Sequence, residues 1–151
     1  MFWTDKKVLI TGGSGFIGSF VVEKLVNRGA HVTVFDRVVN GILKNLPNLK
    51  EKISLIQGEC SSLTEAIAAC KSQEIVMNLA AHVGGIDYNR HHQGTMLYDN
   101  LAIASTMIEA ARRAKVDRFL IVSSACVYPH EAIVPTPESE GDRGEPEETN
   151  G

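Results

Sequence analysis

The sequence predicts an α/β fold with one domain built on a parallel β-sheet. Short runs of β-branched and apolar residues alternate with stretches whose apolar residues recur at helical spacing. A glycine-rich segment joins the first such run to the first helical stretch. The length of 151 residues, with 44% apolar and 22% charged residues, suits one globular domain. Strands that alternate with helices form parallel sheets joined by right-handed crossovers.

The first half of the chain contains three predicted strands and two predicted helices. A helix is expected over residues 15–28, because Ile17, Val21 and Leu25 recur every four positions and Gly29 follows as a stop. Residues 37–52 contain Pro47 and predict a loop with at most a short helix. A second, short helix is expected near residues 63–70. The predicted strands are Lys7–Ile10, His31–Phe35 and Ile53–Gln57.

The second half adds two strands and a long helix. The strands are expected over Ile75–Leu79 and Phe119–Val122, and a glycine-containing loop over His82–Gly94. Between them lies a stripe at helical spacing, with Arg112 and Arg113 where they suit the negative end of a helix dipole. The stripe consists of Leu97, Leu101, Ala104, Ile108 and Ala111.

The chain divides by composition near residue 130. Residues 131–151 carry seven acidic residues against Arg143 alone, and they show no apolar periodicity. They predict an irregular, acidic, proline-rich tail beyond a folded domain over residues 1–130.

Charge and cysteine content limit the possible partners. A net charge of −3 gives no electrostatic case for nucleic acid or a membrane surface, and no segment approaches membrane-spanning length. His91 and His92 have no acid or cysteine at ligand spacing, so no metal site is expected. Three cysteines without framework spacing, and no signal-like apolar run at the N-terminus, favour a reducing cytoplasm.

The glycine-rich segment carries the strongest functional signal. Gly12, Gly15 and Gly18 stand between the first strand and the first helix, and Asp36 ends the second strand eighteen residues later. Small residues let the backbone approach a pyrophosphate at the positive end of the helix, and Asp36 can accept hydrogen bonds from ribose hydroxyls. The pattern predicts a Rossmann-type, doubly wound sheet that binds NAD. An arginine such as Arg37 can hold a 2′-phosphate, so NADP stays open at this point.

The stretch "SSACVYP", residues 123–129, follows the fifth predicted strand. Taken alone, Cys126 there is more often an inert packing residue than a reactive one. Ligands of open α/β sheets nevertheless bind beyond the carboxyl ends of the strands, so chemistry at this point stays open.

The segment "TGGSGFIG" resembles the extended short-chain dehydrogenase/reductase superfamily, many of whose members modify nucleotide sugars. "QGEC" stands where the superfamily has a Gly-Asp pair near adenine, with Glu59 in place of Asp, and "NLAAHVGGI" resembles its loop beside the nicotinamide ribose. The resemblance implies cofactor contacts from Gly12, Gly15, Phe16, Ile17, Gly18, Asp36, Arg37, Glu59, Cys60, Leu79, Ala80, Ala81, Asn100 and Ser123.

Two features resemble the GDP-mannose 3,5-epimerase and GDP-L-fucose synthase branch. One is Val83–Ile86, and the other is Cys126, which matches the proton-transfer cysteine of that branch and reverses the inert interpretation. Ser124 matches the catalytic hydroxyl, and Gly84, Gly85, Ser124 and Cys126 would contact the nucleotide sugar. The implied reaction oxidises the sugar at C4, exchanges protons at C3 and C5, and reduces C4 again.

The superfamily's Tyr-x-x-x-Lys pair normally follows a segment like "EPEETNG", and this sequence ends at Gly151. We therefore expect the N-terminal part of a longer, homodimeric enzyme, able to hold NAD but not to turn over. A nucleotide-sugar 4,6-dehydratase, a UDP-sugar 4-epimerase and a non-catalytic NAD sensor remain alternatives.

Overall fold

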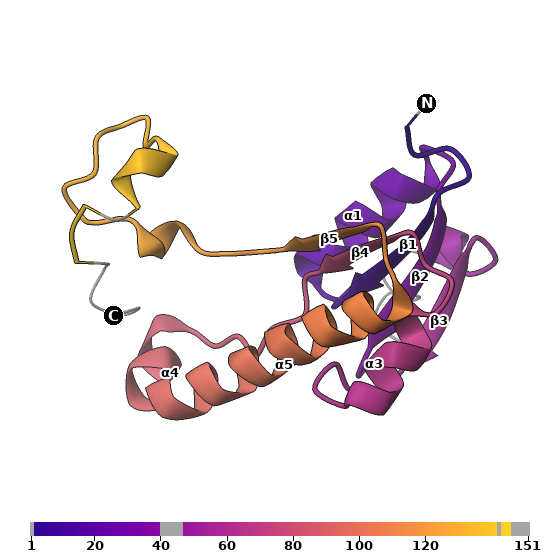
Figure 1. Cartoon of the computed structure of the whole chain (residues 1–151), viewed down its shortest axis with the longest axis horizontal. Coiled ribbons are helices and arrows are strands. Elements are labelled where there is room, and N and C mark those ends of the chain that lie inside the picture. The colour runs from indigo at the N-terminus through magenta and orange to yellow at the C-terminus, as the bar shows by residue number, and fades with distance from the viewer. Residues whose placement is uncertain (1, 40–46, 142, 146–151) are drawn as a thin grey trace.

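The computed structural model describes residues 2–39, 47–141 and 143–145. Its centre is a five-stranded sheet in the order β3-β2-β1-β4-β5, with every neighbouring pair parallel (Figure 1). The α/β fold class and the doubly wound sheet predicted from the sequence are confirmed. The strands are β1 (Lys7–Thr11), β2 (His31–Asp36), β3 (Ile53–Gln57), β4 (Ile75–Asn78) and β5 (Arg118–Ile121).

The helices follow the predicted order with one addition. The predicted loop over residues 82–94 is wrong, because it contains the short helix α4 and the first residues of α5. Asp87 in the first turn of α4 and Arg90 and His91 in its last turn suit the helix dipole, although no apolar periodicity marks the helix. The helices are α1 (Phe16–Val26), α3 (Leu63–Cys70), α4 (Ile86–His91) and α5 (Gln93–Ala114), with 3₁₀ turns η1 (Pro47–Leu49), η2 (Ala125–Val127) and η3 (Glu138–Glu140).

Part of the predicted loop over 37–52 lies outside the described residues, namely 40–46. The described part holds η1, in agreement with the expectation of at most a short helix. Among the helices that the structure describes, none combines the length and apolar character needed to cross a membrane.

The core has two layers, one on each face of the sheet. Successive side chains of β1 point to opposite faces, so Val8 and Ile10 pack with Val22 of α1, whereas Leu9 packs with Ala66 of α3 and Met107 of α5. Four of the five residues of β1 and four of the six of β2 are buried. The strands whose ends carry the glycine loop and Asp36 are therefore the best-anchored part of the chain.

The long helix α5 is confirmed, but most of the apolar stripe that predicts it faces solvent. Leu97 and Leu101 are 62% and 57% exposed, whereas Met107, Ala110 and Ala111 form the buried face against α3 and the sheet. The N-terminal half of α5 extends past the sheet, with α4 at its end (Figure 1). Helical spacing reveals an apolar face, but it does not reveal which of two such faces is covered.

After β5 the chain leaves the sheet. Residues 122–141 and 143–145, here called the arm, run out in an extended segment to η2 and η3 at the far end of the molecule (Figure 1). The arm carries its own contacts, such as the ion pair between Arg143 Nη1 and the buried Glu140 Oε1 at 2.6 Å. The predicted domain boundary at residue 130 stays a prediction. In the structure the chain leaves the sheet at residue 122, eight residues earlier.

Candidate functional site

The topological switch point of the sheet lies between β1 and β4. After β1 the chain winds outward through β2 and β3, and it then returns to the other side of β1 to form β4 and β5. In open α/β sheets the crevice beyond the carboxyl ends of two such strands is where ligands bind. The residues that follow β1 and β4 are therefore the natural candidates for a binding site.

Thr11, the last residue of β1, ties the two strand ends together. Its buried hydroxyl donates to Asn78 Oδ1 at 2.6 Å and accepts from the backbone N–H groups of Leu79 and Ala80 at 3.1 and 3.0 Å. One buried hydroxyl thus satisfies the buried Asn78 oxygen and two partly buried N–H groups. The sequence analysis missed this role, because a threonine at a strand end has many possible uses.

The glycines between the end of β1 and the first turn of α1 are required by close contacts. Gly12 has a φ of +65°, and a Cβ there would lie 2.9 Å from Ala80 Cα. A Cβ on Gly18 would overlap the carbonyl oxygen of Gly12, and one on Gly13 would lie 2.8 Å from Val34 Cγ1. The loop is therefore pressed against both the helix it opens and the strands beside it.

The start of α1 is shaped to receive an anion. Gly15 is the N-cap residue without a side-chain cap, and the first turn contains no acidic residue. Gly15, Phe16 and Ile17 are exposed, and the first N–H groups of a helix have no intrahelical partner. The hydroxyl of Ser14 is buried, with no hydrogen-bond partner among the described residues. These features fit the diphosphate of a dinucleotide, and Ser14 is a candidate contact that the sequence analysis missed.

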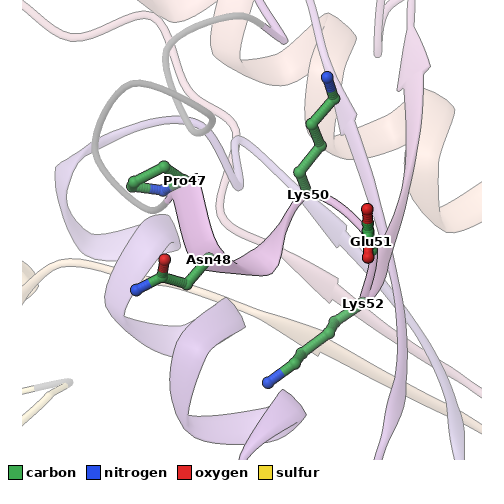
Figure 2. Close-up of a pocket in the computed structure, with 5 residues that line it drawn as sticks. All are labelled: Pro47, Asn48, Lys50, Glu51 and Lys52. Atoms are coloured by element: carbon green, nitrogen blue, oxygen red, sulfur yellow. The ribbon is translucent and has the colours of Figure 1, made fainter.

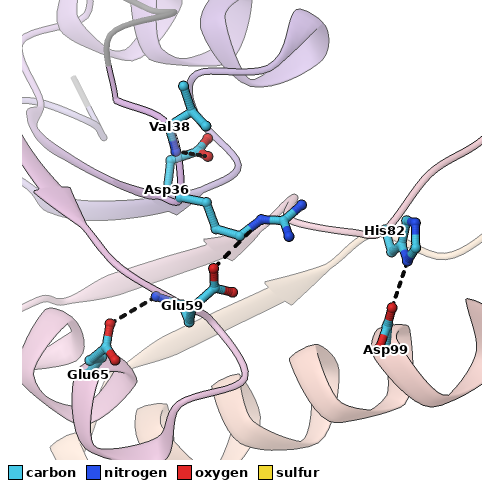
Figure 3. Close-up of polar contacts among 7 residues, drawn as sticks. Asp36, Val38, Glu59, Glu65, His82 and Asp99 are labelled. Carbon is cyan, nitrogen blue, oxygen red and sulfur yellow. Dashed lines mark hydrogen bonds and ion pairs between the residues drawn. The ribbon is translucent and has the colours of Figure 1, made fainter. Parts of the chain in front are cut away.

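Asp36 lies at the end of β2 beside this loop. Its Oδ2 accepts from the backbone N–H of Ser14 at 3.0 Å. Its Oδ1 accepts from the N–H of Val38 at 3.2 Å (Figure 3). The carboxylate is half-buried and fixed next to the phosphate-binding end of α1. A ribose joined to a diphosphate at that helix would meet this acid.

The turn after β3 stands next to Asp36. The backbone N–H of Glu59 donates to Glu65 Oε2 at 2.9 Å, and Glu59 Oε1 lies 3.9 Å from Arg37 Nε (Figure 3). The thiol of Cys60 is buried in the core, and burial, with the carboxylates of Asp36 and Glu59, raises its pKa to about 12. Cys60 therefore stays protonated, and its predicted contact with the cofactor stays a prediction.

The loop after β4 is clamped by two neighbouring residues of α5. Asn100 Oδ1 accepts from the backbone N–H of His82 at 2.8 Å, and Asn100 Nδ2 donates to the His82 carbonyl at 3.0 Å. His82 Nδ1 lies 2.7 Å from Asp99 Oδ2 (Figure 3). The amide of Asn100 thus braces the backbone of the loop that includes Ala81. The His82–Asp99 pair was not found from the sequence, because its members lie seventeen positions apart.

The two glycines of the following segment differ in their surroundings. A Cβ on Gly84 would lie 2.5 Å from Tyr88 Cδ1, so this glycine lets α4 pack against the loop. Gly85 faces open space and caps α4. The ring of Tyr88 stacks on His92 at 4.0 Å. Only the second glycine thus presents a free face, and the predicted substrate contacts of both stay predictions.

Ser123, Ser124 and Cys126 lie on the arm. Ser124 Oγ accepts from the backbone N–H of Cys126 at 3.2 Å and caps η2. The arm runs away from the sheet (Figure 1), and within the described residues no hydrogen bond joins these three residues to the glycine loop. The structure therefore brings together the glycine loop, the end of β2 and the loop after β4, and the predicted roles of Ser123, Ser124 and Cys126 stay predictions.

A surface hollow near η1 has no part in this site. It is bordered by one turn of chain, and none of the predicted site residues lines it (Figure 2). Its lining residues are Pro47, Asn48, Lys50, Glu51 and Lys52. Within residues 2–39, 47–141 and 143–145, no three His, Cys, Asp or Glu side chains come together as metal ligands would.

Known proteins are similar to this chain in sequence. The family described as NAD dependent epimerase/dehydratase matches residues 8–151. GDP-mannose 3,5-epimerase 1 of Oryza sativa subsp. indica is 30% identical over 99% of this chain and 40% of its own length. GDP-L-fucose synthase of Escherichia coli K12 is 30% identical over 97% of this chain and 41% of its own length.

The fold of this chain is also similar to that of a solved epimerase structure. The UDP-N-acetylglucosamine 4-epimerase from Methanobrevibacter ruminantium M1, in complex with UDP-N-acetylmuramic acid, superposes with a TM-score of 0.79 at 27% identity. The match covers 91% of this chain and 44% of that structure. The chain thus spans about 40% of the length of the curated relatives named above. With nearly its whole length matched, the chain belongs to the NAD dependent epimerase/dehydratase family.

Proposed function

We propose that this chain is the cofactor-binding part of a nucleotide-sugar epimerase of the GDP-mannose 3,5-epimerase and GDP-L-fucose synthase type. Both kinds of relative are 30% identical to it over nearly its whole length. Cys126, two residues before Tyr128, carries the choice of this branch, because a thiol there can exchange protons at sugar carbons.

NAD, the cofactor of the family, would lie across the switch point between β1 and β4. The uncapped start of α1 and the hydroxyl of Ser14 would bind its diphosphate, with Gly12, Gly15 and Gly18 allowing the close approach. Asp36 would accept the hydroxyls of the adenine ribose. The loop of Leu79, Ala80 and Ala81 would border the nicotinamide ribose.

The chemistry divides between the cofactor and the arm. NAD supplies a hydride acceptor that later returns the hydride. Ser124 would hold the hydroxyl of the sugar at C4, and Cys126 would remove a proton from C3 or C5 once C4 is a ketone. Cys126 is half-buried in η2, where the hydroxyl of Ser124 fixes its backbone N–H. For this to happen, the arm must meet the crevice when substrate is bound.

We further propose that the 151-residue chain binds NAD without turning over substrate. None of its three tyrosines has a lysine four residues later, since His92, Ala102 and Ala132 occupy those positions. The tyrosine and lysine that act as acid and base in the resembling superfamily would come from the rest of a longer protein, along with most of the sugar site. A dimer of that protein would use the exposed stripe of α5, which includes Leu97 and Leu101. The three free cysteines suit a reducing cytoplasm.

Deuterium exchange tests this proposal. The longer protein is incubated with GDP-mannose in D₂O, and deuterium at C3 and C5 is followed by mass spectrometry. Cys126→Ser is expected to lower the exchange at least about a hundredfold, because a hydroxyl is a far weaker base than a thiolate. Cys70→Ala, a change at a buried cysteine, is the control and leaves exchange within about twofold. Unchanged exchange in Cys126→Ser would contradict the assignment.

A UDP-sugar 4-epimerase or a nucleotide-sugar 4,6-dehydratase is the second candidate. The structural similarity to the Methanobrevibacter UDP-N-acetylglucosamine 4-epimerase favours the former. Inversion at C4 requires no proton exchange at C3, so its activity would survive Cys126→Ser. Turnover of a UDP-sugar without deuterium at C3 or C5 would establish the 4-epimerase. A non-catalytic NAD sensor would bind NAD and show no turnover in any longer form.

A further inference from the structure

We propose that Glu59 makes the site prefer NAD over NADP by holding the guanidinium of Arg37 away from the position of a 2′-phosphate. This inference rests on the proposed function, in which the adenine ribose of the coenzyme lies beside Asp36. The sequence leaves Arg37 ambiguous, because an arginine directly after the acid of β2 is able to bind the extra phosphate of NADP. The structure gives that arginine a partner.

The pair stands where the coenzyme would reach it. Arg37 Nε lies 3.9 Å from Glu59 Oε1, and the two side chains are 68% and 54% exposed. Arg37 directly follows Asp36, which pairs with Gln57 of β3, and Glu59 lies two residues beyond Gln57. An exposed pair is weak and can be exchanged for a better partner, so a dianionic phosphate would compete with Glu59 for Arg37.

The backbone at Glu59 is fixed relative to β2. Its N–H donates to Glu65 Oε2 at 2.9 Å, and the N–H of Gly58 donates to the carbonyl of Asp36 at 3.0 Å. A Cβ on Gly58 would lie 2.7 Å from the ring of Phe35, so the turn lies directly on the end of β2. Glu59 is therefore held opposite Arg37 by the fold.

The local charge favours a ligand without the extra phosphate. Asp36 and Glu59 contribute two negative charges against one positive charge from Arg37, and both carboxylates help to raise the pKa of the neighbouring Cys60 thiol. Asp36 itself cannot turn away, because its Oδ2 accepts from the N–H of Ser14. A 2′-phosphate, with close to two negative charges at neutral pH, would enter a region that is already net negative.

The alternative role of Glu59 is a direct contact with adenine, which is what the resemblance implies. The two roles predict different results. If Glu59 contacts adenine, its removal should change the affinities for NAD and NADP equally. If Glu59 restrains Arg37, its removal should change the affinity for NADP alone, and only while Arg37 is present.

The test measures the affinity of the 151-residue chain for NAD and for NADP by calorimetry at low ionic strength. The variants are Glu59→Gln, Arg37→Gln and the double variant, with Glu109→Gln as the control. Glu109 also pairs with arginines, Arg112 and Arg113, on the exposed surface of α5, so this change removes the same charge and a similar ion pair elsewhere. Circular dichroism confirms that each variant is folded.

Glu59→Gln is expected to tighten NADP binding by about threefold to tenfold and to leave NAD binding within about twofold. The double variant is expected to lose that gain, and Glu109→Gln to change neither affinity. Unchanged NADP affinity in Glu59→Gln, an equal change for both coenzymes, or a gain that persists in the double variant would each overturn the inference while the NAD site stands. Failure of the unaltered chain to bind either coenzyme would overturn the proposed function, and this inference with it.

Discussion

The glycine loop and the arm are held in place in different ways. The loop follows β1, which is buried on both faces, and Thr11 at the end of β1 makes one buried and two partly buried hydrogen bonds to the end of β4 and the residues after it. The arm follows β5, an edge strand whose Leu120 and Ile121 are nearly half exposed. The hydrogen bonds of η2 join near neighbours, such as Ser124 and Cys126.

The difference separates the two halves of the predicted site. The half that would bind NAD is fixed by the core of this chain. The half that would act on a sugar is fixed by local turns and needs further contacts to reach the crevice. Changes in the glycine loop should therefore alter both stability and coenzyme affinity, whereas a change at Cys126 on the arm should alter neither.

Gly18→Ala is expected to have the largest effect. The added methyl group would overlap the carbonyl oxygen of Gly12, so the loop must shift. Coenzyme binding is expected to be lost, with a decrease of about 3 kcal/mol in the free energy of unfolding. Calorimetry and urea denaturation measure the two effects.

Gly94→Ala is the matched control, because a Cβ there meets nothing within 4 Å in the first turn of α5. The same chemical change should stabilise the chain slightly, by about 0.5 kcal/mol, and leave NAD affinity unchanged. Equal behaviour of the two alanine variants would contradict the account of the loop.

Thr11→Val tests the connection between β1 and β4. Valine keeps the shape of threonine, but it leaves the N–H groups of Leu79 and Ala80 without an acceptor. The free energy of unfolding should decrease by about 2 kcal/mol, and NAD should bind more weakly. Thr11→Ser keeps the hydroxyl and should lose less than half as much. Equal losses in the two variants would show that packing, not hydrogen bonding, matters at this position.

The two buried thiols, Cys60 and Cys70, should make the chain less stable at alkaline pH. Burial raises the pKa of Cys60 to about 12 and that of Cys70 to about 11, from about 9 in the unfolded chain. The folded state thus keeps protons that the unfolded state releases, so the stabilising contribution is full below pH 9 and is lost as the pH rises toward 12. Cys60→Ala should make the decline between pH 9 and pH 11 shallower by about 1–2 kcal/mol. Parallel declines for the two proteins would refute this.

Cys126→Ser is expected to have the smallest effect on the isolated chain. The residue is half-buried on the arm, outside both core clusters. The free energy of unfolding should change by less than about 0.5 kcal/mol, and NAD affinity should stay within twofold. Urea denaturation and calorimetry check both values. A large loss of either would show that the arm is coupled to the sheet.

Much of the sheet could be predicted from the sequence. The bounds of β3 and α3 agree with the expected ones. Those of β1, β2 and β4 differ by one residue at one end, and those of β5 by one residue at each end. These elements are short apolar runs or clear amphipathic stretches between breakers, so local pattern and tertiary burial agree. The glycine spacing and Asp36 indicated the site because each has a specific steric or charge requirement.

The contacts that support the site could not be predicted. Thr11, Ser14 and the His82–Asp99 pair are ordinary polar residues until the fold places them next to a partner far away in the sequence. The helix α4 lacks apolar periodicity, and the exposed stripe of α5 has the same spacing as a buried one. All these misses have one cause. A sequence pattern indicates the local preference of a segment, whereas its contacts and its burial depend on which other segments pack against it.

The most direct test of the account is a calorimetric titration of the unaltered 151-residue chain with NAD. We expect one molecule of NAD to bind per chain, and we expect no binding by folded Gly18→Ala. A folded chain that releases no heat and shows no shift in melting temperature at millimolar NAD would contradict the central claim that the crevice between β1 and β4 holds the coenzyme.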